Sequence, residues 1–366
     1  MKRSLAATLA LIASLTPALA CTAVDLMAGD KSVIAGRTME WAFDMKWTLV
    51  SVPKGTELTL TAPRALNLPP QKVTTLYPVV GISAGIIPGG AILEGQNGAG
   101  LGMSANFLPG FTEYQTVTAA DKNYVDILTF GSWVLGSFAT VDEVRAALPK
   151  TKVWADGTLN SGPTPPTIHF VFNDRSGKGI VVEYVNGELQ IHDNVAHVLT
   201  NAPTYDWHLN NLRNYLNLSS VGPTERTIAG VNVTALGQGG GLFGLPGDYT
   251  PPSRFVRAAA LAATATRPAT SEEGIQTVGH ILNTVDIPIG AAQFRKADGT
   301  LGSDYTQWVA IKDLTNNRLL IADYAHRTNY LTIDLNPVFA ATTPAATLVT
   351  ELPYPGTAPV TTFAKP

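Results

Sequence analysis

The chain has 366 residues, of which 45% are hydrophobic and 14% charged, and its formal net charge at pH 7 is −3. This length allows one large domain or two ordinary ones. A net charge so close to zero gives no reason to expect a nucleic acid or an anionic membrane surface as a partner. The single cysteine excludes a disulfide within the chain.

The first residues predict a secretory signal peptide that ends before Cys21. Two basic residues precede an apolar run at 5–15, and Ala18-Leu19-Ala20 is the small-x-small pattern after which signal peptidase cleaves. We therefore expect residues 1–20 to be removed and the mature protein to be periplasmic or secreted. Beyond this segment no apolar run is long enough to span a bilayer.

Cleavage at this place would make Cys21 the first residue of the mature protein. Its thiol could then act as the nucleophile and its own α-amine, with an ordinary pKa of about 7.7–8.0, as the base. Three other interpretations stay open: a buried small hydrophobe, the lipid anchor of a lipoprotein, or an incidental residue if cleavage falls elsewhere. A lipoprotein signal prefers Leu three residues before the cysteine and a small residue two before, whereas Ala18 and Leu19 stand there.

The middle of the chain predicts two helices and then three antiparallel strands. The helices are expected over Tyr124–Phe138, which is apolar on most sides, and from the capping box at 140–143 to the residue before Pro149. The strands are expected over Thr167–Asn173, Gly179–Val185 and Glu188–His192. Asn186-Gly187 is a strong hairpin signal between the last two of them.

The second half of the chain repeats this separation of helices and strands. Two helices are expected over Tyr205–Leu216 and Ser271–Val285, followed by strands at Gln307–Asp313, Leu319–Tyr324 and Tyr330–Asp334. Hairpins and helices in separate groups indicate layered α+β structure rather than alternating βαβ units. We expect one domain over 21–342 and an extended, poorly packed tail over 343–366.

Several short motifs occur in a fixed order along the chain. They begin with Cys21-Thr22 and with Gly36-Arg37-Thr38-Met39-Glu40. They continue with NGAGLG (97–102), ANF (105–107), VLTNAPTYDW (198–207), TALGQ (234–238), GLPGDYT (244–250), SRF (253–255) and DYTQ (304–307). The ordered set resembles the choloylglycine hydrolase family of N-terminal-nucleophile hydrolases, which includes penicillin V acylases and conjugated bile salt hydrolases.

The resemblance implies a four-layer αββα sandwich with two antiparallel sheets, and commonly a homotetramer. The stretch Leu216–Val233 lies where the family has an inter-subunit loop. The resemblance also implies that Cys21 attacks an amide carbonyl and that Arg37 lies beside its sulfur, where a fixed cation favours the thiolate. From the residues alone, Arg37 could equally be a surface charge at a strand end.

Four further roles follow from the resemblance. Glu40 stands where the family has Asp, whose carboxylate orients the N-terminal amine; Glu is one methylene longer, so the same bond needs a shifted backbone or rotamer. Asn201 would contribute its side chain to an oxyanion hole and Asn106 its backbone N–H. Arg254 would support the charge balance of the site. Without the resemblance, Asn201 would be a turn residue before Ala202-Pro203 and Arg254 a first-turn residue of a helix.

Trp41 follows Glu40 directly and could line the acyl pocket, although a core position would also explain it. The six histidines lack metal-ligand spacing, so we expect neither a metal nor a cofactor. These observations predict an exported hydrolase of small-molecule acyl amides that resembles penicillin V acylase and could act on N-acyl-homoserine lactones. The alternatives are a conjugated bile salt hydrolase, or a lipoprotein or binding protein that lost catalysis.

Overall fold

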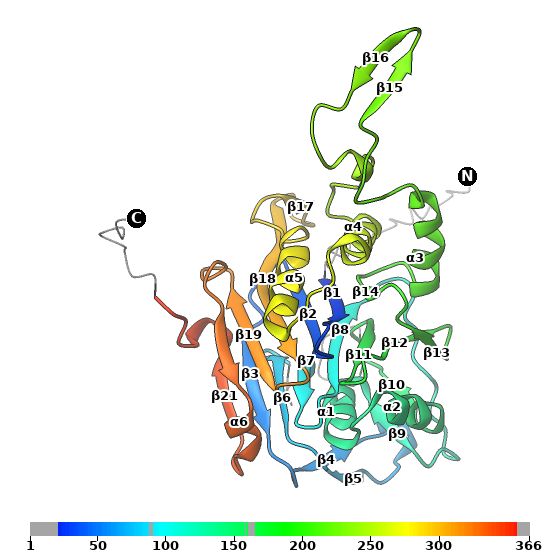
Figure 1. The fold of residues 1–366 in the computed structure, drawn as a ribbon. Helices are drawn as coiled ribbons and strands as arrows, with labels where there is room; N and C mark the ends of the chain where they lie inside the picture. The colour runs from blue at the N-terminus through cyan, green and yellow to red at the C-terminus, as the bar shows by residue number, and fades with distance from the viewer. Residues whose placement is uncertain (1–20, 88–90, 158, 160–164, 357–366) are drawn as a thin grey trace, which may run out of the picture.

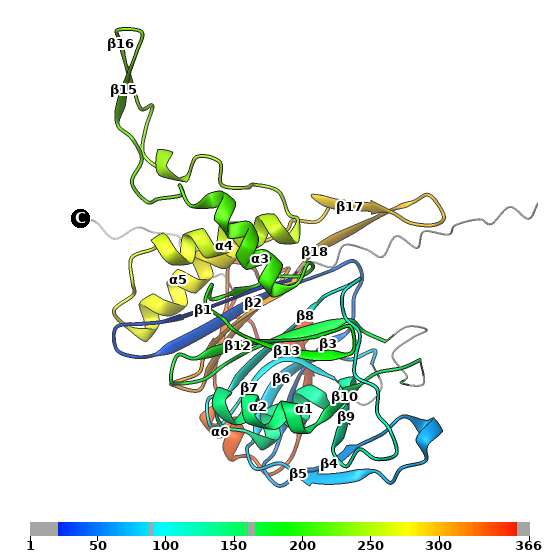
Figure 2. The same cartoon turned by 90° about the vertical axis from the view of Figure 1, so that its right-hand side faces the viewer.

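The computed structural model describes residues 21–87, 91–157, 159 and 165–356, so the predicted signal peptide at 1–20 lies outside the described residues. Two large antiparallel sheets lie face to face, and helices cover the outer face of each sheet (Figures 1 and 2). The predicted α+β class and the αββα layer order are therefore confirmed.

The first sheet holds the strand that begins at Cys21. Its strand order is β14-β1-β2-β18-β19-β20, and β17 pairs with the far end of β18. The strands are β1 Cys21–Met27, β2 Val33–Trp41, β14 Val198–Leu199, β17 Ala292–Arg295, β18 Leu301–Asp313, β19 Arg318–Asp323 and β20 Leu331–Asp334. Strand β18 is longer than predicted because its first residues continue outward to pair with β17.

The second sheet has eight strands in the order β13-β12-β11-β8-β7-β6-β3-β21. These are β3 Trp47–Val52, β6 Val79–Ala84, β7 Ile92–Asn97, β8 Gly102–Phe107, β11 Ile168–Asn173, β12 Gly179–Val185, β13 Glu188–Asp193 and β21 Ala345–Leu348. The predicted hairpin is present, since Asn186 and Gly187 have positive φ angles of 53° and 74°, as a type I′ turn requires.

The helices form the two outer layers. Helices α3 Tyr205–Leu212, α4 Pro251–Thr264 and α5 Ser271–Asn283 lie over the first sheet, and α1 Ile127–Ser137 and α2 Val141–Ala147 lie over the second (Figure 2). Thr140 caps α2 by accepting from the Glu143 N–H at 3.2 Å, as the capping box predicted. Side chains alternate along β2. Even-numbered residues face the helices, and Gly36 packs against α5 there. Odd-numbered residues, such as Arg37, face the second sheet.

Three predicted helices differ from the structure at their ends, and the one predicted over Ser271–Val285 ends two residues earlier, at Asn283. The helix predicted from Tyr124 begins at Ile127, because Asp126 is its N-cap and accepts from the Thr129 N–H at 2.9 Å. The preceding residues form β9 Tyr124–Asp126, parallel to β10 Lys152–Trp154. The helix predicted to reach Leu216 ends at Leu212 and continues as a 3₁₀ turn, Arg213–Tyr215.

The segment from 343 is extended, but part of it is packed. Strand β21 adds to the edge of the second sheet beside β3, and the following Val349 is buried. A poorly packed arm is therefore the wrong description for this part of the tail. The boundary between domain and tail stays a prediction.

The remaining elements are small. They are the hairpin β4 Glu57–Leu60 with β5 Gln71–Thr74, the short helix α6 Asn336–Ala340, and the hairpin β15 Glu225–Ile228 with β16 Val231–Thr234. The last hairpin stands well away from the body of the molecule in both views (Figures 1 and 2). None of the helices in the described part is long and apolar enough to cross a membrane.

Candidate active site

Cys21 is the first residue of β1 and lies opposite Met39 in β2. Its side chain faces the second sheet and is fully buried, with 0% of its surface exposed. The sulfur lies 3.3 Å from Nη2 of Arg37 and 3.7 Å from Sδ of Met39. The register of one short hairpin therefore places the cysteine and the arginine together, as the resemblance implied.

Opposing effects act on the ionisation of this thiol. Burial raises the pKa of Cys21 above its ordinary value, because the thiolate loses its hydration. The charge of Arg37 lowers the pKa, the charge of Glu40 raises it, and hydrogen bonds from Arg37 and from the Glu40 backbone lower it. Burial dominates, so the resting group is a thiol, and the arginine alone does not make it a thiolate.

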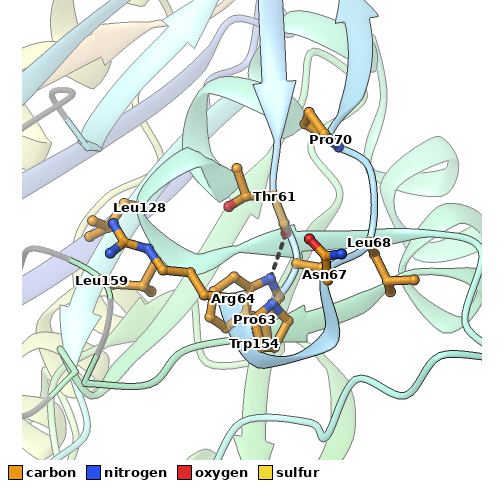
Figure 3. Close-up of a pocket in the computed structure, with 10 residues that line it drawn as sticks. Thr61, Pro63, Arg64, Asn67, Leu68, Pro70, Leu128, Trp154 and Leu159 are labelled. Carbon is orange, nitrogen blue, oxygen red and sulfur yellow. Dashed lines mark hydrogen bonds between the residues drawn. The ribbon is translucent and has the colours of Figure 1, made fainter.

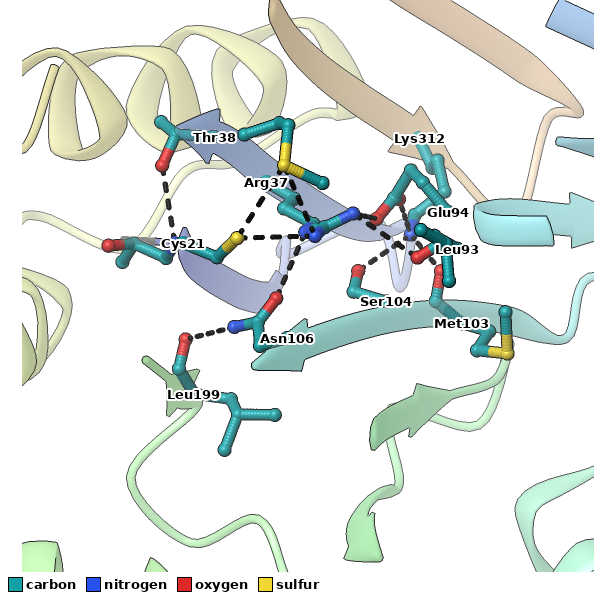
Figure 4. A network of polar contacts seen from close by, with 12 residues as sticks. Cys21, Arg37, Thr38, Leu93, Glu94, Met103, Ser104, Asn106, Leu199 and Lys312 are labelled. Carbon is teal, nitrogen blue, oxygen red and sulfur yellow. Dashed lines mark hydrogen bonds and ion pairs between the residues drawn. The ribbon is translucent and has the colours of Figure 1, made fainter. Parts of the chain in front are cut away.

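The Arg37 guanidinium is held from several directions between the two sheets (Figure 4). Nε donates to Oδ1 of Asn106 at 2.9 Å, and Nη1 donates to the Leu93 carbonyl at 3.2 Å. The ring of Trp308 lies under it, 5.2 Å from Cζ to the ring centroid. The contacts come from β8, β7 and β18, which fixes the cation beside the sulfur.

Asn201 lies just after β14 and holds the nitrogen of Cys21. Its Oδ1 accepts from this nitrogen at 2.7 Å, and its Nδ2 donates to the Phe107 carbonyl at 2.9 Å. An amide nitrogen carries two N–H groups, and among the described residues only the Phe107 carbonyl accepts from this one, so the other N–H can bind an incoming oxygen. The backbone of Asn201 is anchored by His208, whose Nε2 donates to its carbonyl at 2.8 Å.

Asn106 connects this segment to the arginine. Its Nδ2 donates to the carbonyl oxygens of Leu199 and Thr200 at 3.1 and 2.9 Å, while its Oδ1 accepts from Arg37. The side chain of Asn106 therefore binds Arg37 and the backbone segment that leads to Asn201. The donation that sequence analysis expected came from its backbone N–H, and that role stays a prediction.

Arg254 lies in the first turns of α4 and is fully buried. Its Nη1 donates to the Cys21 carbonyl and to Oγ1 of Thr22, both at 2.6 Å. Its Nη2 donates to Oδ1 of Asn201 at 2.8 Å. Through Arg254, helix α4 is therefore hydrogen-bonded to the first two residues of β1 and to Asn201. Arg254 is not only a residue in the first turn of a helix, because its side chain joins these parts of the site.

Glu40 is on the helix side of β2, the face opposite to the Cys21 sulfur. Its Oε1 accepts from Oγ1 of Thr306 at 2.7 Å, and its Oε2 has no hydrogen-bond partner among the described residues. The Cys21 nitrogen donates to Asn201 rather than to this carboxylate. Burial raises the pKa of Glu40 to about 7, against the lowering effects of Arg254 and Thr306.

Comparison with known proteins identifies this arrangement. A family described as linear amide C–N hydrolases, choloylglycine hydrolase family, matches residues 21–336. The chain belongs to this family. It is 31% identical to a bile salt hydrolase/transferase of Clostridium perfringens over 79% of this chain and 85% of the relative. The enzyme therefore hydrolyses linear amides and is of the bile salt hydrolase and penicillin V acylase type.

Solved structures share the fold over most of their length. A mutant of the conjugated bile acid hydrolase from Clostridium perfringens has a TM-score of 0.77 and 29% identity, covering 89% of this chain and 96% of that one. Penicillin V acylase from Agrobacterium tumefaciens has a TM-score of 0.69 and 23% identity, covering 89% and 90%. The resemblance and the fold predicted from the motifs are confirmed.

Trp41 ends β2 on the same face as Arg37 and Met39. Its ring packs against Phe107, with 4.7 Å between centroids, and meets the edge of Phe43 at 5.8 Å. The indole is buried, and its Nε1 has no hydrogen-bond partner in the described part of the chain. Because the Phe107 carbonyl also binds Asn201, this aromatic cluster adjoins the predicted oxyanion site.

The family site contains residues that sequence analysis missed. Thr306 binds Glu40, and the buried ion pair of Glu94 with Lys312 adjoins Arg37. A signal was available, since Glu94 follows Ile92-Leu93 and Lys312 follows the apolar run 308–311 in their strands, and charged residues are rarely buried without a partner. Their pairing was not predictable, because 218 residues separate them.

A separate cavity lies away from the predicted site residues. A cavity of about 570 Å³ lies beside the loop that joins β4 to β5, lined among others by Arg64, Asn67 and Trp154 (Figure 3). The indole of Trp154 donates to the Thr61 carbonyl there at 2.7 Å. None of the predicted site residues lines this cavity.

The raised pKa of Glu40 predicts a pH-dependent stability of the uncleaved chain. Its pKa is about 7 in the folded state against an ordinary value of 4.5, so the folded state binds the proton more tightly. The free energy of unfolding should therefore fall as pH rises through this range, by up to about 3 kcal/mol. Glu40→Gln has no proton to lose and should flatten this part of the curve. Denaturant unfolding at about pH 5 and pH 8 measures both slopes, and equal slopes would contradict the assignment.

Proposed function

We propose that the enzyme is an exported N-acyl amide hydrolase in which Cys21 is the nucleophile and its α-amine is the general base. The observation that carries the proposal is that two of the predicted site residues contact the two reactive groups of Cys21. Its sulfur contacts Arg37, and its nitrogen binds Asn201. In the full chain this nitrogen belongs to a peptide bond. Removal of residues 1–20 would turn it into an amine beside the thiol.

The first half of the proposed reaction forms a thioester. The amine takes the thiol proton as Sγ attacks the amide carbonyl carbon, and the carbonyl oxygen becomes an oxyanion. The free N–H of Asn201 and a backbone N–H near Asn106 would hold this oxygen. The intermediate then collapses as the amine passes the proton to the leaving nitrogen, which releases the amine product.

The second half regenerates the enzyme. Water attacks the thioester carbon, the α-amine accepts one of its protons, and collapse returns that proton to the departing sulfur. The acyl group leaves as a carboxylic acid. In both halves of the reaction, Arg254 would hold the Cys21 carbonyl and the Asn201 side chain in position. Glu40 would supply a negative charge on the face of β2 that is turned toward the helices.

We further propose that Trp41 forms part of the acyl-binding wall. Its contact with Phe107 gives an aromatic surface beside Asn201, which suits a phenoxyacetyl group or a fatty acyl chain. Penicillin V is therefore the reporter substrate we expect. N-acyl-homoserine lactones are the natural class we favour, and their hydrolysis would make the enzyme quorum-quenching.

A conjugated bile salt hydrolase is the second candidate. The observation that favours it is the name of the Clostridium perfringens relative, a bile salt hydrolase/transferase. Against it stands the predicted signal peptide, because the bile salt hydrolases that the motifs resemble normally act inside the cell. The two candidates share the chemistry and differ in the acyl group and in the amine that is released.

A substrate panel tests the proposal. The mature chain that begins at Cys21 is assayed with penicillin V, glycine- and taurine-conjugated bile salts, and short- and long-chain N-acyl-homoserine lactones. Preference for penicillin V or the lactones supports the exported acylase, and preference for bile salts supports the second candidate. No turnover of any of them, by a chain with a free Cys21, would oppose both.

The mass of the N-terminal peptide tests export and the non-enzymatic alternative. A mature chain that begins with unmodified Cys21 is competent for the proposed chemistry. A lipidated cysteine would have its thiol blocked, and would favour a lipoprotein that lost catalysis.

We propose a homotetramer assembled through the projecting hairpin β15–β16. Ile228 and Val231 are exposed on it, 56% and 64% of their surfaces, which favours a contact with another chain. Light scattering should give four times the chain mass for the mature protein and a smaller assembly for Ile228→Asp/Val231→Asp. The control Val195→Asp, at an exposed site elsewhere, should leave the mass unchanged. A monomeric wild type would refute the assembly.

A further inference from the structure

Three charged side chains meet in the interior between the sheets (Figure 4). Lys312 of β18 forms an ion pair with Oε1 of Glu94 in β7, and its Nζ also donates to the Met103 carbonyl at 2.9 Å and to Oγ of Ser104 at 3.1 Å. Lys312 and Glu94 are each only 1% exposed. All three donors of the ammonium group therefore point to the second sheet, across the sandwich.

The second oxygen of Glu94 points toward the site. Its Oε2 lies 3.7 Å from Nη1 of Arg37, yet it has no hydrogen-bond partner among the described residues. The Arg37 nitrogen donates instead to the Leu93 carbonyl. Glu94 is thus bound to Lys312 and only loosely paired with the arginine that contacts the nucleophile.

A contribution to the stability of the fold does not by itself explain the buried ion pair of Glu94 with Lys312. A buried ion pair is often no more stabilising than apolar residues of similar volume, because both charges lose their hydration. The charges are also unequal, since two cations, Arg37 and Lys312, face the single carboxylate of Glu94. A thiolate at Cys21 would balance the remaining positive charge.

The surrounding charges do not remove this imbalance. Glu40 and Arg254 lie on the helix side of β2, where they oppose each other. Asp25 of β1 acts on Lys312 more weakly than the other charges around that lysine, and its own ion-pair partner is His197 at 2.6 Å. The excess positive charge inside the sandwich is therefore directed at the Cys21 sulfur through Arg37.

We propose that Lys312 is a positioning residue for the nucleophile and acts by holding Glu94, an inference that rests on the proposed role of Cys21. Lys312 holds Glu94 back from Arg37, so that the guanidinium stays on the sulfur and its charge is not cancelled. Without Lys312, the freed carboxylate would bind Arg37 directly. The arginine would then move toward β7, and the thiolate would lose its stabilising cation.

The test compares Lys312→Met with the double variant Glu94→Gln/Lys312→Met. Because Cys21 is the only cysteine, the ultraviolet absorbance of the thiolate reports it alone once the spectrum of Cys21→Ser is subtracted. In Lys312→Met the midpoint of the thiolate titration should rise by about one pH unit, and kcat at neutral pH should fall about tenfold with little change in KM. In the double variant, which lacks the competing carboxylate, the midpoint and kcat should return close to those of the wild type.

Rescue by the second substitution separates this role from a structural one. If Lys312→Met does not fold, Lys312→Gln takes its place, because it also lacks the positive charge; it should show the same shift, and Glu94→Gln/Lys312→Gln the same rescue. An unchanged midpoint in Lys312→Met, a double variant shifted as far as the single one, or a double variant that does not fold would overturn it. Failure of the proposed function is distinguishable, because Cys21→Ala would then still hydrolyse substrate.

Discussion

Cys21→Ala is expected to abolish amide hydrolysis, with kcat reduced by at least about 10⁴-fold, while the protein still folds. The sulfur is the only group placed to form the thioester, and Arg37, Asn201 and Arg254 are all arranged around this one residue. Removing one buried sulfur leaves the backbone contacts of Cys21 in place, so stability should change little. Turnover is measured on the mature chain, and unfolding by denaturant.

Cys21→Ser is the matched control for this prediction. It keeps a nucleophilic atom and the hydrogen bond to Arg37, but its hydroxyl is far less nucleophilic than a thiol, so weak activity is expected. Undiminished turnover by a folded Cys21→Ala chain would refute the mechanism. If Cys21→Ala does not fold, Cys21→Ser provides the test instead. A fully active serine variant would also contradict a mechanism that needs a thiolate.

Asn201→Ala should reduce kcat by about 10²- to 10³-fold with a smaller effect on KM. One preorganised oxyanion donor contributes about this much, because it acts where negative charge develops in the transition state. The substitution also removes the acceptor that holds the Cys21 nitrogen at 2.7 Å. Steady-state kinetics with penicillin V, or with the substrate that the panel identifies, measure both parameters.

Asn210→Ala is the control, because Asn210 is an exposed asparagine on the helix that follows the same segment. It should leave kcat and KM unchanged. A kcat for Asn201→Ala within about threefold of the wild type would exclude a donor role for its side chain. A raised KM with unchanged kcat would place Asn201 in substrate binding instead.

Local signals in the sequence predicted much of the secondary structure. Asn186-Gly187 predicted its hairpin, because these residues adopt the positive φ angles that the turn requires. Thr140 and Glu143 predicted the start of α2 through their capping bonds. The start of α1 was predicted three residues too early, since an apolar run does not distinguish a buried strand from a buried helix, and Asp126 was not recognised as the cap.

The contact between Cys21 and Arg37 was expected from the resemblance to the family and not from the residues alone. Two strands joined by a short turn bring residues 21 and 37 to the same face, and the ordered motifs assigned the family. Asn201 and Arg254 were found only through those motifs. Nothing local distinguishes them from a turn residue and a helix residue.

By itself, then, the sequence determined the family and the layered α+β class, and it indicated Cys21 as the proposed nucleophile, because these depend on residue identity, order and strand alternation. Tertiary structure alone decided that Glu40 faces the helices and binds Thr306, and that Lys312 crosses the sandwich to Glu94. Contacts of this kind join strands from distant parts of the chain. The packing of the two sheets sets the distances between these side chains. Burial and the neighbouring charges then determine the ionisation of each group.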